Sequence, residues 1–303
     1  MTQPDTYKLY ILRHGQSELN HENIFCGWID AQLTSKGKEQ AKNAAILIKE
    51  HCAHNSVHLP RVGYSSRLVR TRQTMEGMLE VLGMENALYK VLCHGMSTNG
   101  LSEDLANHDA VVFQTWRLNE RHYGAWQGQR KPDILEEYGK EEYMFIRRDY
   151  KGTPPAADLS REMIQEVNDK GSLTGYDFKE PTRSIKYKVE ENSGEVLPSN
   201  ESLSDVVGRL NDFWNEVILK NLNDNNPSAL VIAHGSSVRS ILKIVENISD
   251  ADIKDVEIPN AIPIVLELHK ATKQFVRKYY LDPELAKVGA ERVRNEGFER
   301  ASN

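Results

Sequence analysis

The stretch YKLYILRHGQSELN, residues 7–20, ends an apolar run with an arginine and a histidine placed side by side. Residues 8–12 have the length and apolar character of a buried strand. The stretch LVIAHGSSVR, residues 230–239, repeats this design with a histidine and a glycine directly after an apolar run. One histidine at a strand end is most often structural, but two in the same setting favour a functional site. Because open α/β sheets bind ligands at the carboxyl ends of their strands, His14 and His234 are predicted to face one another there.

The segments around these two strands alternate between helix and strand patterns. Thr34 is predicted to be the N-cap of a helix whose apolar face recurs at helical spacing from Ala41 to Ile48. Met75 to Leu82 repeat that spacing, and a longer amphipathic helix is predicted from Leu203 to Val217. The remaining expected elements are strands at 62–65 and 229–233 and a helix at 237–245. This alternation predicts an α/β fold with three layers, α/β/α, around a mainly parallel central sheet.

Two turn-rich stretches interrupt this alternation. They span about 88–112 and about 156–200, and we interpret both as surface insertions. The charged tail from about 282 to 303 is either a mobile flap or a frayed end. The chain of 303 residues is long enough to bury a substantial core. We therefore expect residues 1–303 to form a single domain with two insertions.

Composition excludes several classes of function. A formal net charge of −6 argues against a general nucleic-acid or membrane-surface binder. The three cysteines, Cys26, Cys52 and Cys93, contain no C-x-x-C pair, so neither a disulfide framework nor a zinc ribbon is indicated. No signal-peptide pattern or membrane-spanning apolar run is found, and we expect a cytoplasmic protein without a metal site.

The residue types around the two histidines are those that phosphoryl transfer needs. Neutral imidazole is a competent nucleophile at physiological pH and can form a phosphohistidine. A helix that begins after Gly235 would aim its amide groups at an anion, and Gly15 would let a phosphate approach the backbone. The stretch LNERHYGAWQG, residues 118–128, offers Glu120 as a carboxylate and Tyr123 as a hydroxyl donor. Arginine candidates for charge neutralisation are Arg13, Arg70, Arg147 and Arg148.

Six segments, taken in this order, resemble the 2,3-bisphosphoglycerate-dependent phosphoglycerate mutases of the histidine phosphatase superfamily: RHGQSELN, SSRLVRTRQT, LNERHYGAWQG, RRDYKGTPP, NESL and AHGSSVR. The resemblance runs from about Lys8 to about Leu281, apart from the two insertions. LNERHYG and RRxxxxTPP are typical of the mutase branch. The resemblance implies the phosphoglycerate mutase-like fold and an isomerase of glycolysis and gluconeogenesis. Such an enzyme interconverts 3-phosphoglycerate and 2-phosphoglycerate through a phosphohistidine.

The resemblance also implies a role for each matching position. His14 would be the phosphorylated nucleophile, Glu120 the proton donor and acceptor, and His234 a second group that stabilises the transition state. The family is primed by 2,3-bisphosphoglycerate, needs no metal, and forms homodimers or homotetramers. Arg13, Asn20 and Arg70 would hold the transferring phosphate. The rest of the implied substrate-binding set is Cys26, Gly27, Arg121, His122, Tyr123, Lys131, Arg147, Arg148, Gly235 and Ser236.

Several positions near the expected pocket depart from the family pattern. Gln16 stands where RHGE is usual, Cys26 where threonine is usual, and Ser236 where asparagine follows AHG. A lost or shortened hydrogen-bond donor would weaken phosphate binding by about 1 kcal/mol. Asn260-Ala261 replaces Thr-Gly, a change that matters only if the backbone there has a positive φ. Two alternatives to an active mutase therefore stay open: a superfamily phosphatase acting on another small phosphate ester, and a degenerate, weakly active or inactive paralogue.

Overall fold

A computed structural model describes residues 5–93, 95, 97–162, 180 and 182–298. In this part of the chain, seven strands form one sheet in the order β3-β4-β2-β5-β1-β6-β7. The strands from β3 to β1 are parallel neighbours, and β6 and β7 are added antiparallel at one edge. Their bounds are β1 Thr6–Arg13, β2 Val62–Ser65, β3 Ala87–Val91, β4 Ala110–Gln114, β5 Ser228–Ala233, β6 Ile264–His269 and β7 Phe275–Tyr280. The sheet is therefore mainly parallel, as the alternation of elements predicts.

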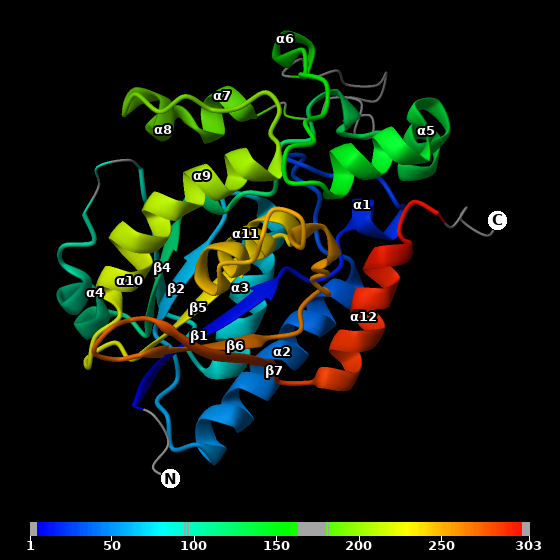
Figure 1. The fold of residues 1–303 in the computed structure, drawn as a ribbon. Coiled ribbons are helices and arrows are strands. Elements are labelled where there is room, and N and C mark those ends of the chain that lie inside the picture. Colours follow the sequence, from blue (N-terminus) through cyan, green and yellow to red (C-terminus); the bar gives the residue numbers. More distant parts are fainter. Residues whose placement is uncertain (1–4, 94, 96, 163–179, 181, 299–303) are drawn as a thin grey trace.

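Helices cover both faces of this sheet (Figure 1). The longer ones are α2 Ser35–His54, α3 Val69–Leu82, α5 Lys131–Arg148, α9 Leu203–Phe213, α11 Gly235–Glu246 and α12 Pro283–Asn295. The shorter ones are α1 Glu18–His21, α4 Leu101–Asn107, α6 Leu159–Glu162, α7 Arg183–Lys186, α8 Lys188–Asn192 and α10 Leu219–Asn221. None of the helices in the described ranges is both long and apolar enough to cross a membrane.

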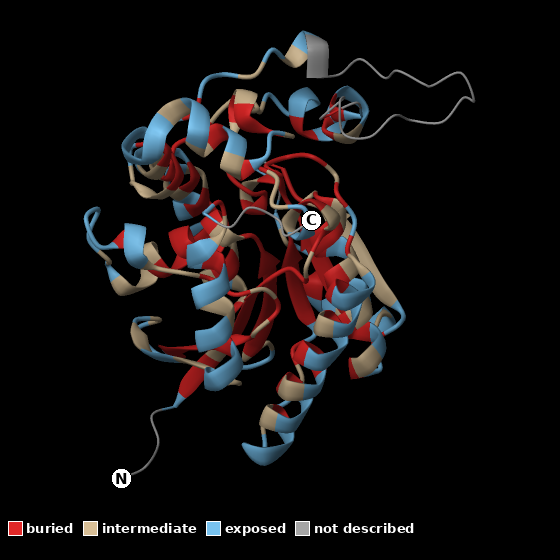
Figure 2. Ribbon diagram, turned by 90° about the vertical axis from the view of Figure 1, so that its right-hand side faces the viewer, coloured by how far each residue is buried: buried red, intermediate tan, exposed pale blue. Residues whose placement is uncertain are grey.

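Alternate residues of β1 divide the core into two layers. Leu9 and Ile11 pack in the cluster that includes apolar side chains of α9 and α11. Tyr10 and Leu12 pack in the opposite cluster with α2 and α3. Successive side chains of a strand point to opposite faces, so a strand that is buried on both faces must be apolar throughout. Figure 2 shows this buried centre between exposed helical surfaces, which confirms the three-layer α/β/α fold.

The predicted helix starts are determined by local capping. Thr34 accepts a hydrogen bond from the Gly37 amide at the first turn of α2. Ser202 and Asp205 form a capping box at the start of α9. Side chains of this kind satisfy amide groups that have no partner within the helix. Both starts lie where the sequence predicts them.

The two expected insertions differ from simple surface loops. Most of β3, helix α4 and most of β4 fall within 88–112, and β3 pairs with β4 in the sheet. This stretch therefore contributes to the central sheet, because its two strands satisfy each other's backbone groups. Helices α7 and α8 fall within 156–200, and Figure 1 shows them with α6 above α9. Residues 163–179 and 181 of that stretch, and 299–303 of the tail, lie outside the described residues.

Candidate active site

The two strand-end histidines lie side by side. Arg13 at the end of β1 pairs in register with Ala233 at the end of β5, so the next residues of the two strands are His14 and His234. Their ring centroids are 5.0 Å apart. Both rings are almost completely buried. The parallel register of two neighbouring strands therefore produces the predicted pair of imidazoles.

The ring of His14 is held at both nitrogen atoms. Its Nδ1 lies 2.6 Å from the carbonyl oxygen of Gly15, which makes Nδ1–H the donor and leaves the lone pair on Nε2. Arg70 Nε donates to that Nε2 at 3.1 Å. Burial, and then the positive charges of Arg70 and Arg13, hold the pKa of His14 well below its usual range. Nε2 is therefore an unprotonated nitrogen among cationic groups, as a nucleophile towards a phosphate must be.

Gly15 lies in close contact with the first turn of α2. A Cβ atom at Gly15 would lie 2.2 Å from the carbonyl oxygen of Gly37 in the first turn of α2. Glycine is therefore needed because two backbone segments approach closely. The approach of a phosphate to this backbone stays a prediction. This contact places the loop after β1 against α2.

A cavity of about 70 Å³ is lined by Arg13 and Gly235, the chain neighbours of His14 and His234, but not by the two histidines or Arg70. It is lined by several predicted residues, Arg13, Asn20, Cys26, Gly27, Glu120, Gly235 and Ser236 among them. Two buried nitrogen atoms, Arg13 Nε and His234 Nδ1, have no hydrogen-bond partner among the described residues. Buried donors or acceptors of this kind are rarely left unpaired, so they fit a ligand such as a phosphate group.

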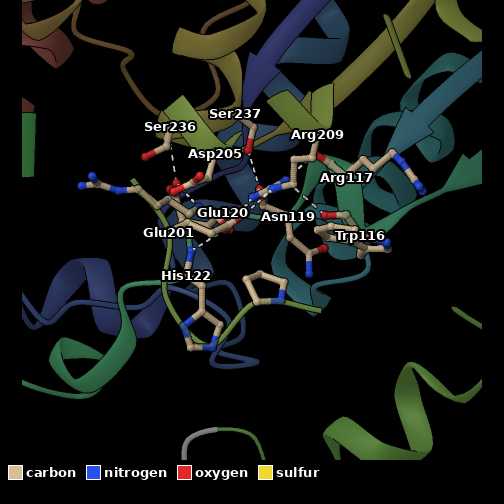
Figure 3. A network of polar contacts seen from close by, with 12 residues as sticks. Trp116, Arg117, Asn119, Glu120, His122, Glu201, Asp205, Arg209, Ser236 and Ser237 are labelled. Atoms are coloured by element: carbon tan, nitrogen blue, oxygen red, sulfur yellow. Dashed lines mark hydrogen bonds and ion pairs between the residues drawn. The ribbon is translucent and has the colours of Figure 1, made fainter. Parts of the chain in front are cut away.

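The carboxylate of Glu120 lies against the first turn of α11 and accepts two backbone hydrogen bonds. The amides of Arg121 and Ser236 donate to its Oε1 at 2.9 and 3.1 Å. Figure 3 shows the side chain of Arg209, from α9, directed towards the loop that carries Asn119 and Glu120. Arg209 forms an ion pair with Glu201 and donates to four backbone carbonyl groups, those of Trp116, Arg117, Asn119 and Glu120. The carboxylate is therefore positioned by backbone amides of a loop that Arg209 holds in place.

Sequence reasoning missed the role of Arg209. The sequence contains a weak indication of this role. Arg209 lies between the buried Val206 and Leu210 of a helix whose outward face is polar. A cation on the inward face of an amphipathic helix indicates a buried partner.

The far side of the cavity carries two cations that hold a carboxylate. Lys131 Nζ donates to Glu296 Oε2 at 2.5 Å. Arg147 donates to the carbonyl oxygen of Glu296 at 2.7 Å, with its guanidinium 3.8 Å from the same carboxylate. Burial alone would raise the pKa of Glu296, but Lys131, Arg13 and Arg147 outweigh it and lower that pKa to about 2. Glu296 follows directly after α12, and no pattern in the sequence indicates this contact.

Tyr123 and Arg148 also line the cavity, each with protein partners. Arg148 forms an ion pair with Glu257 at 2.8 Å and donates to the carbonyl groups of Lys254 and Val256. The Arg121 guanidinium lies 4.6 Å from the ring centroid of Tyr123. Burial acts to raise the pKa of the Tyr123 hydroxyl, but the charge of Arg121 outweighs it and lowers that pKa.

Arg121 and His122, predicted to bind substrate, do not line the cavity. Arg121 is fully buried and donates to the carbonyl groups of Ile146, Arg147 and Gly152. His122 Nε2 donates to Glu180 at 2.5 Å, and its Nδ1 accepts from the Gly124 amide. Both side chains bond buried groups of the protein. Substrate binding by either of them stays a prediction.

The departures from the family pattern occupy different surroundings. Cys26 and Ser236 line the cavity, and the Cys26 thiol lies 3.6 Å from the carbonyl oxygen of Ile29. Gln16 does not line it, and its Oε1 accepts a hydrogen bond from Thr34 at 3.0 Å. Ala261 has a φ of +51°, the condition under which its replacement of glycine matters.

Comparison with known proteins identifies the class to which this fold and site belong. The model of the histidine phosphatase superfamily (branch 1) matches residues 9–92 and 169–280. The chain belongs to the histidine phosphatase superfamily. In the described residues, no cluster of three or more histidine, cysteine or acidic side chains could hold a metal ion.

Individual relatives within the superfamily carry more specific names. Phosphoglycerate mutase 3 of Saccharomyces cerevisiae is 60% identical over 301 residues, which cover 99% of both chains. The 2,3-bisphosphoglycerate-dependent phosphoglycerate mutase of Corynebacterium diphtheriae is 37% identical over 293 residues, which cover 96% of this chain and 98% of that protein. A mycobacterial glucosyl-3-phosphoglycerate phosphatase shares the fold, with a TM-score of 0.58, 19% identity and coverage of 90% and 98%.

Proposed function

We propose that this protein is a 2,3-bisphosphoglycerate-dependent phosphoglycerate mutase, which interconverts 3-phosphoglycerate and 2-phosphoglycerate in glycolysis and gluconeogenesis. The observation that carries the proposal is a cavity with two kinds of anion site. Arg13 lines it beside the buried pair of His14 and His234, and Lys131 and Arg147 already hold a carboxylate. A phosphoglycerate carries one phosphate and one carboxylate, which match these two sites.

The groups around His14 account for a phosphoryl transfer in two steps. Bound 2,3-bisphosphoglycerate supplies the first phosphoryl group. His14 Nε2 forms a bond to phosphorus while the ester P–O bond breaks, and Glu120 gives a proton to the leaving oxygen. In the second step, Glu120 removes a proton from a substrate hydroxyl, and that oxygen attacks the phosphorus. The P–N bond breaks and its electron pair returns to Nε2.

Positive charge stabilises both steps. Arg13 and Asn20 line the cavity, and Arg70 donates to His14 Nε2, which supports the proposal that these three residues hold the transferring group where negative charge gathers. Phosphoryl transfer depends mainly on positioning and charge neutralisation, so these residues supply most of what the reaction needs. Isomerisation results because 3-phosphoglycerate accepts the phosphoryl group at its free 2-hydroxyl to give 2,3-bisphosphoglycerate. The bisphosphate then gives its 3-phosphoryl group to His14 and leaves as 2-phosphoglycerate.

One assay distinguishes this proposal from its alternatives. Purified protein is given 3-phosphoglycerate with and without 2,3-bisphosphoglycerate, while 2-phosphoglycerate and free phosphate are measured. Isomerisation that needs the bisphosphate and releases little phosphate supports a mutase. Phosphate release alone would indicate a phosphatase, and binding without turnover a degenerate paralogue.

A labelling experiment tests the nucleophile. Incubation with 2,3-bisphosphoglycerate should give an acid-labile phosphoenzyme at His14, located by mass spectrometry. The matched control is His54→Ala, because His54 is exposed at the end of α2. Label that survives in His14→Ala would overturn the assignment.

We further propose a cytoplasmic homodimer or homotetramer that acts on this small substrate alone, without a nucleic-acid or membrane partner. The family resemblance supports this assembly. Sedimentation velocity on the purified protein measures the number of subunits.

A further inference from the structure

Ser66 is a fully buried residue directly after β2 that contacts the second histidine. Its Oγ lies 2.8 Å from His234 Nε2. The same oxygen lies 2.7 Å from Thr71 Oγ1 and accepts a hydrogen bond from the Leu68 amide at 3.1 Å. Thr71 Oγ1 in turn lies 2.8 Å from the carbonyl oxygen of Leu68. Ser66 and Thr71 therefore form a two-hydroxyl chain behind His234.

The hydrogen atoms of this chain have one favoured direction. Each hydroxyl carries a single hydrogen. If Thr71 donates to the Leu68 carbonyl, Ser66 donates to Thr71, and the Nε2–H of His234 donates to Ser66, which gives three hydrogen bonds. The reverse direction gives two, and it places a hydrogen on His234 Nδ1, an atom without a partner among the described residues. The first direction is favoured because it leaves no buried donor unpaired.

The charges around His234 favour the same arrangement. Four groups act on the charge of its ring: Arg70 of α3, Arg13 at the end of β1, His14 directly after β1, and Arg209 of α9. A bare Nδ1 lone pair is attracted to these cations, whereas an N–H would be repelled. Burial, and then the charge of Arg70, hold the pKa of His234 well below its usual range. In the free protein the ring is therefore neutral.

We propose that Ser66, supported by Thr71, is a positioning residue that keeps His234 in the Nε2–H tautomer. This deepens the proposed function and rests on it. The bare Nδ1 then takes up a proton from solvent when a phosphate dianion binds, and donates it as a hydrogen bond to a phosphate oxygen. The proton returns to solvent when the phosphate leaves. The dianion favours this protonation because its negative charge, placed among the surrounding cations, raises the pKa of His234.

Nitrogen NMR of the histidine rings tests the tautomer directly. In the free protein, His234 Nε2 is expected to carry hydrogen and Nδ1 to be bare. With inorganic phosphate as the probe, both nitrogens should carry hydrogen, and calorimetry in buffers of different ionisation enthalpy should detect proton uptake. His122 is the matched control, because its Nε2 and Nδ1 both have partners within the protein, whereas His234 Nδ1 has none among the described residues. Its signals should not change.

Variants separate positioning from simple structural support. Ser66→Ala should lower kcat about tenfold to a hundredfold, as expected for loss of a hydrogen bond to a charged group. It should also move the alkaline limb of the kcat profile to lower pH, because the imidazolium loses its Nε2–H acceptor. Ser66→Thr should restore most of the activity. Ser65→Ala is the matched control, since the Ser65 hydroxyl bonds only the Ser66 carbonyl among the described contacts.

Two results would overturn the inference. One is a hydrogen on Nδ1 in the free protein, which needs no ligand to detect. The other is a bare Nδ1 in a protein that demonstrably binds phosphate. Failure of the wild-type protein to bind phosphate or phosphoglycerate would instead overturn the proposed function, so the two failures are distinguishable.

Discussion

Ala261 has a strained backbone conformation and bonds the residue before the proposed nucleophile His14. Its φ of +51° lies in the left-handed region, where a Cβ atom crowds the neighbouring carbonyl group. Its amide donates to the Arg13 carbonyl at 2.9 Å, and the neighbouring Asn260 donates to the His14 carbonyl at 2.9 Å. These two contacts support the end of β1, so the strain lies within the frame of the site.

Ala261→Gly should therefore stabilise the protein. Relief of the left-handed conformation is worth about 1–2 kcal/mol, and the greater freedom of glycine in the unfolded chain removes about 0.5–1 kcal/mol of this. Urea unfolding should show a net gain of about 0.75 kcal/mol, within a range of roughly 0–1.5 kcal/mol. Ala53→Gly, at an exposed position of α2, should lose stability instead. Equal losses in both variants would show that the backbone at 261 carries no strain.

Cys26 and Ser236 are the departures from the family pattern that line the cavity. Cys26→Thr adds a stronger hydroxyl donor, and Ser236→Asn adds an amide donor that reaches further. Each should raise mutase kcat/KM, by about fivefold for a hydrogen bond worth about 1 kcal/mol. The two effects should not simply add, because both side chains share one cavity. Gln16→Glu is the control, because Gln16 bonds Thr34 outside that cavity. If neither variant gains more activity than this control, Cys26 and Ser236 do not limit turnover.

Helix α12 closes the far side of the site. Gly289 lets it lie on Pro259, because a Cβ at Gly289 would come within 2.6 Å of the proline ring. The residue after the helix, Glu296, then reaches Lys131 and Arg147. In the proposed mechanism, these cations bind the substrate carboxylate, so Glu296 and substrate compete for them.

Glu296→Gln should lower the KM for 3-phosphoglycerate about twofold to tenfold with little change in kcat, because the substrate no longer displaces a carboxylate. Steady-state kinetics measure this. Glu291→Gln, an exposed position on α12, is the matched control and should leave KM unchanged. A higher KM in Glu296→Gln would mean that Glu296 positions the two cations for substrate instead of competing with it.

A buried group of charges joins the segment before α7 to the loop that carries Glu120. Glu180 bonds His122 of that loop and forms an ion pair with Arg183 at 2.6 Å. Burial alone would raise the pKa of Glu180, but the hydrogen bond from His122 and the charge of Arg183 outweigh it and lower that pKa to about 2. This network connects distant parts of the chain, so it bears on unfolding of the molecule as a whole.

Stability should fall in acid partly through Glu180. A carboxylate with a pKa of about 2 in the folded protein and about 4.3 unfolded stabilises the fold above pH 5 by roughly 3 kcal/mol. That contribution is lost as pH falls from about 4.3 towards 2. Urea unfolding of Glu180→Gln should therefore show lower stability at pH 7 and a shallower decline below pH 5. Glu39→Gln, exposed on α2, should follow the wild-type curve, and an unchanged slope in Glu180→Gln would contradict the assignment.

Short patterns in the sequence are sufficient for the elements that carry the two histidines. The apolar runs before His14 and His234 predict β1 and β5, and helical spacing predicts α2 and α9. These periods are properties of a few consecutive residues, so they can be recognised without the fold. Strand β3 escapes recognition because it is a half-buried edge strand with no clear alternation. Strand β4 is fully buried, and its apolar run AVVF is typical of a strand. It escapes prediction because the preceding residues are rich in turn formers.

The partners of the charged and polar groups in the site depend on the path of the whole chain. Lys131 and Glu296 are 165 residues apart, and Ser66 and His234 are 168 residues apart. Neither pair has a local signature. Arg121 and His122 lie in a motif that predicts substrate contacts, yet burial directs both to groups inside the protein. A buried polar atom must be satisfied by whatever packing brings within about 3 Å of it, and nearness in space is independent of position along the chain.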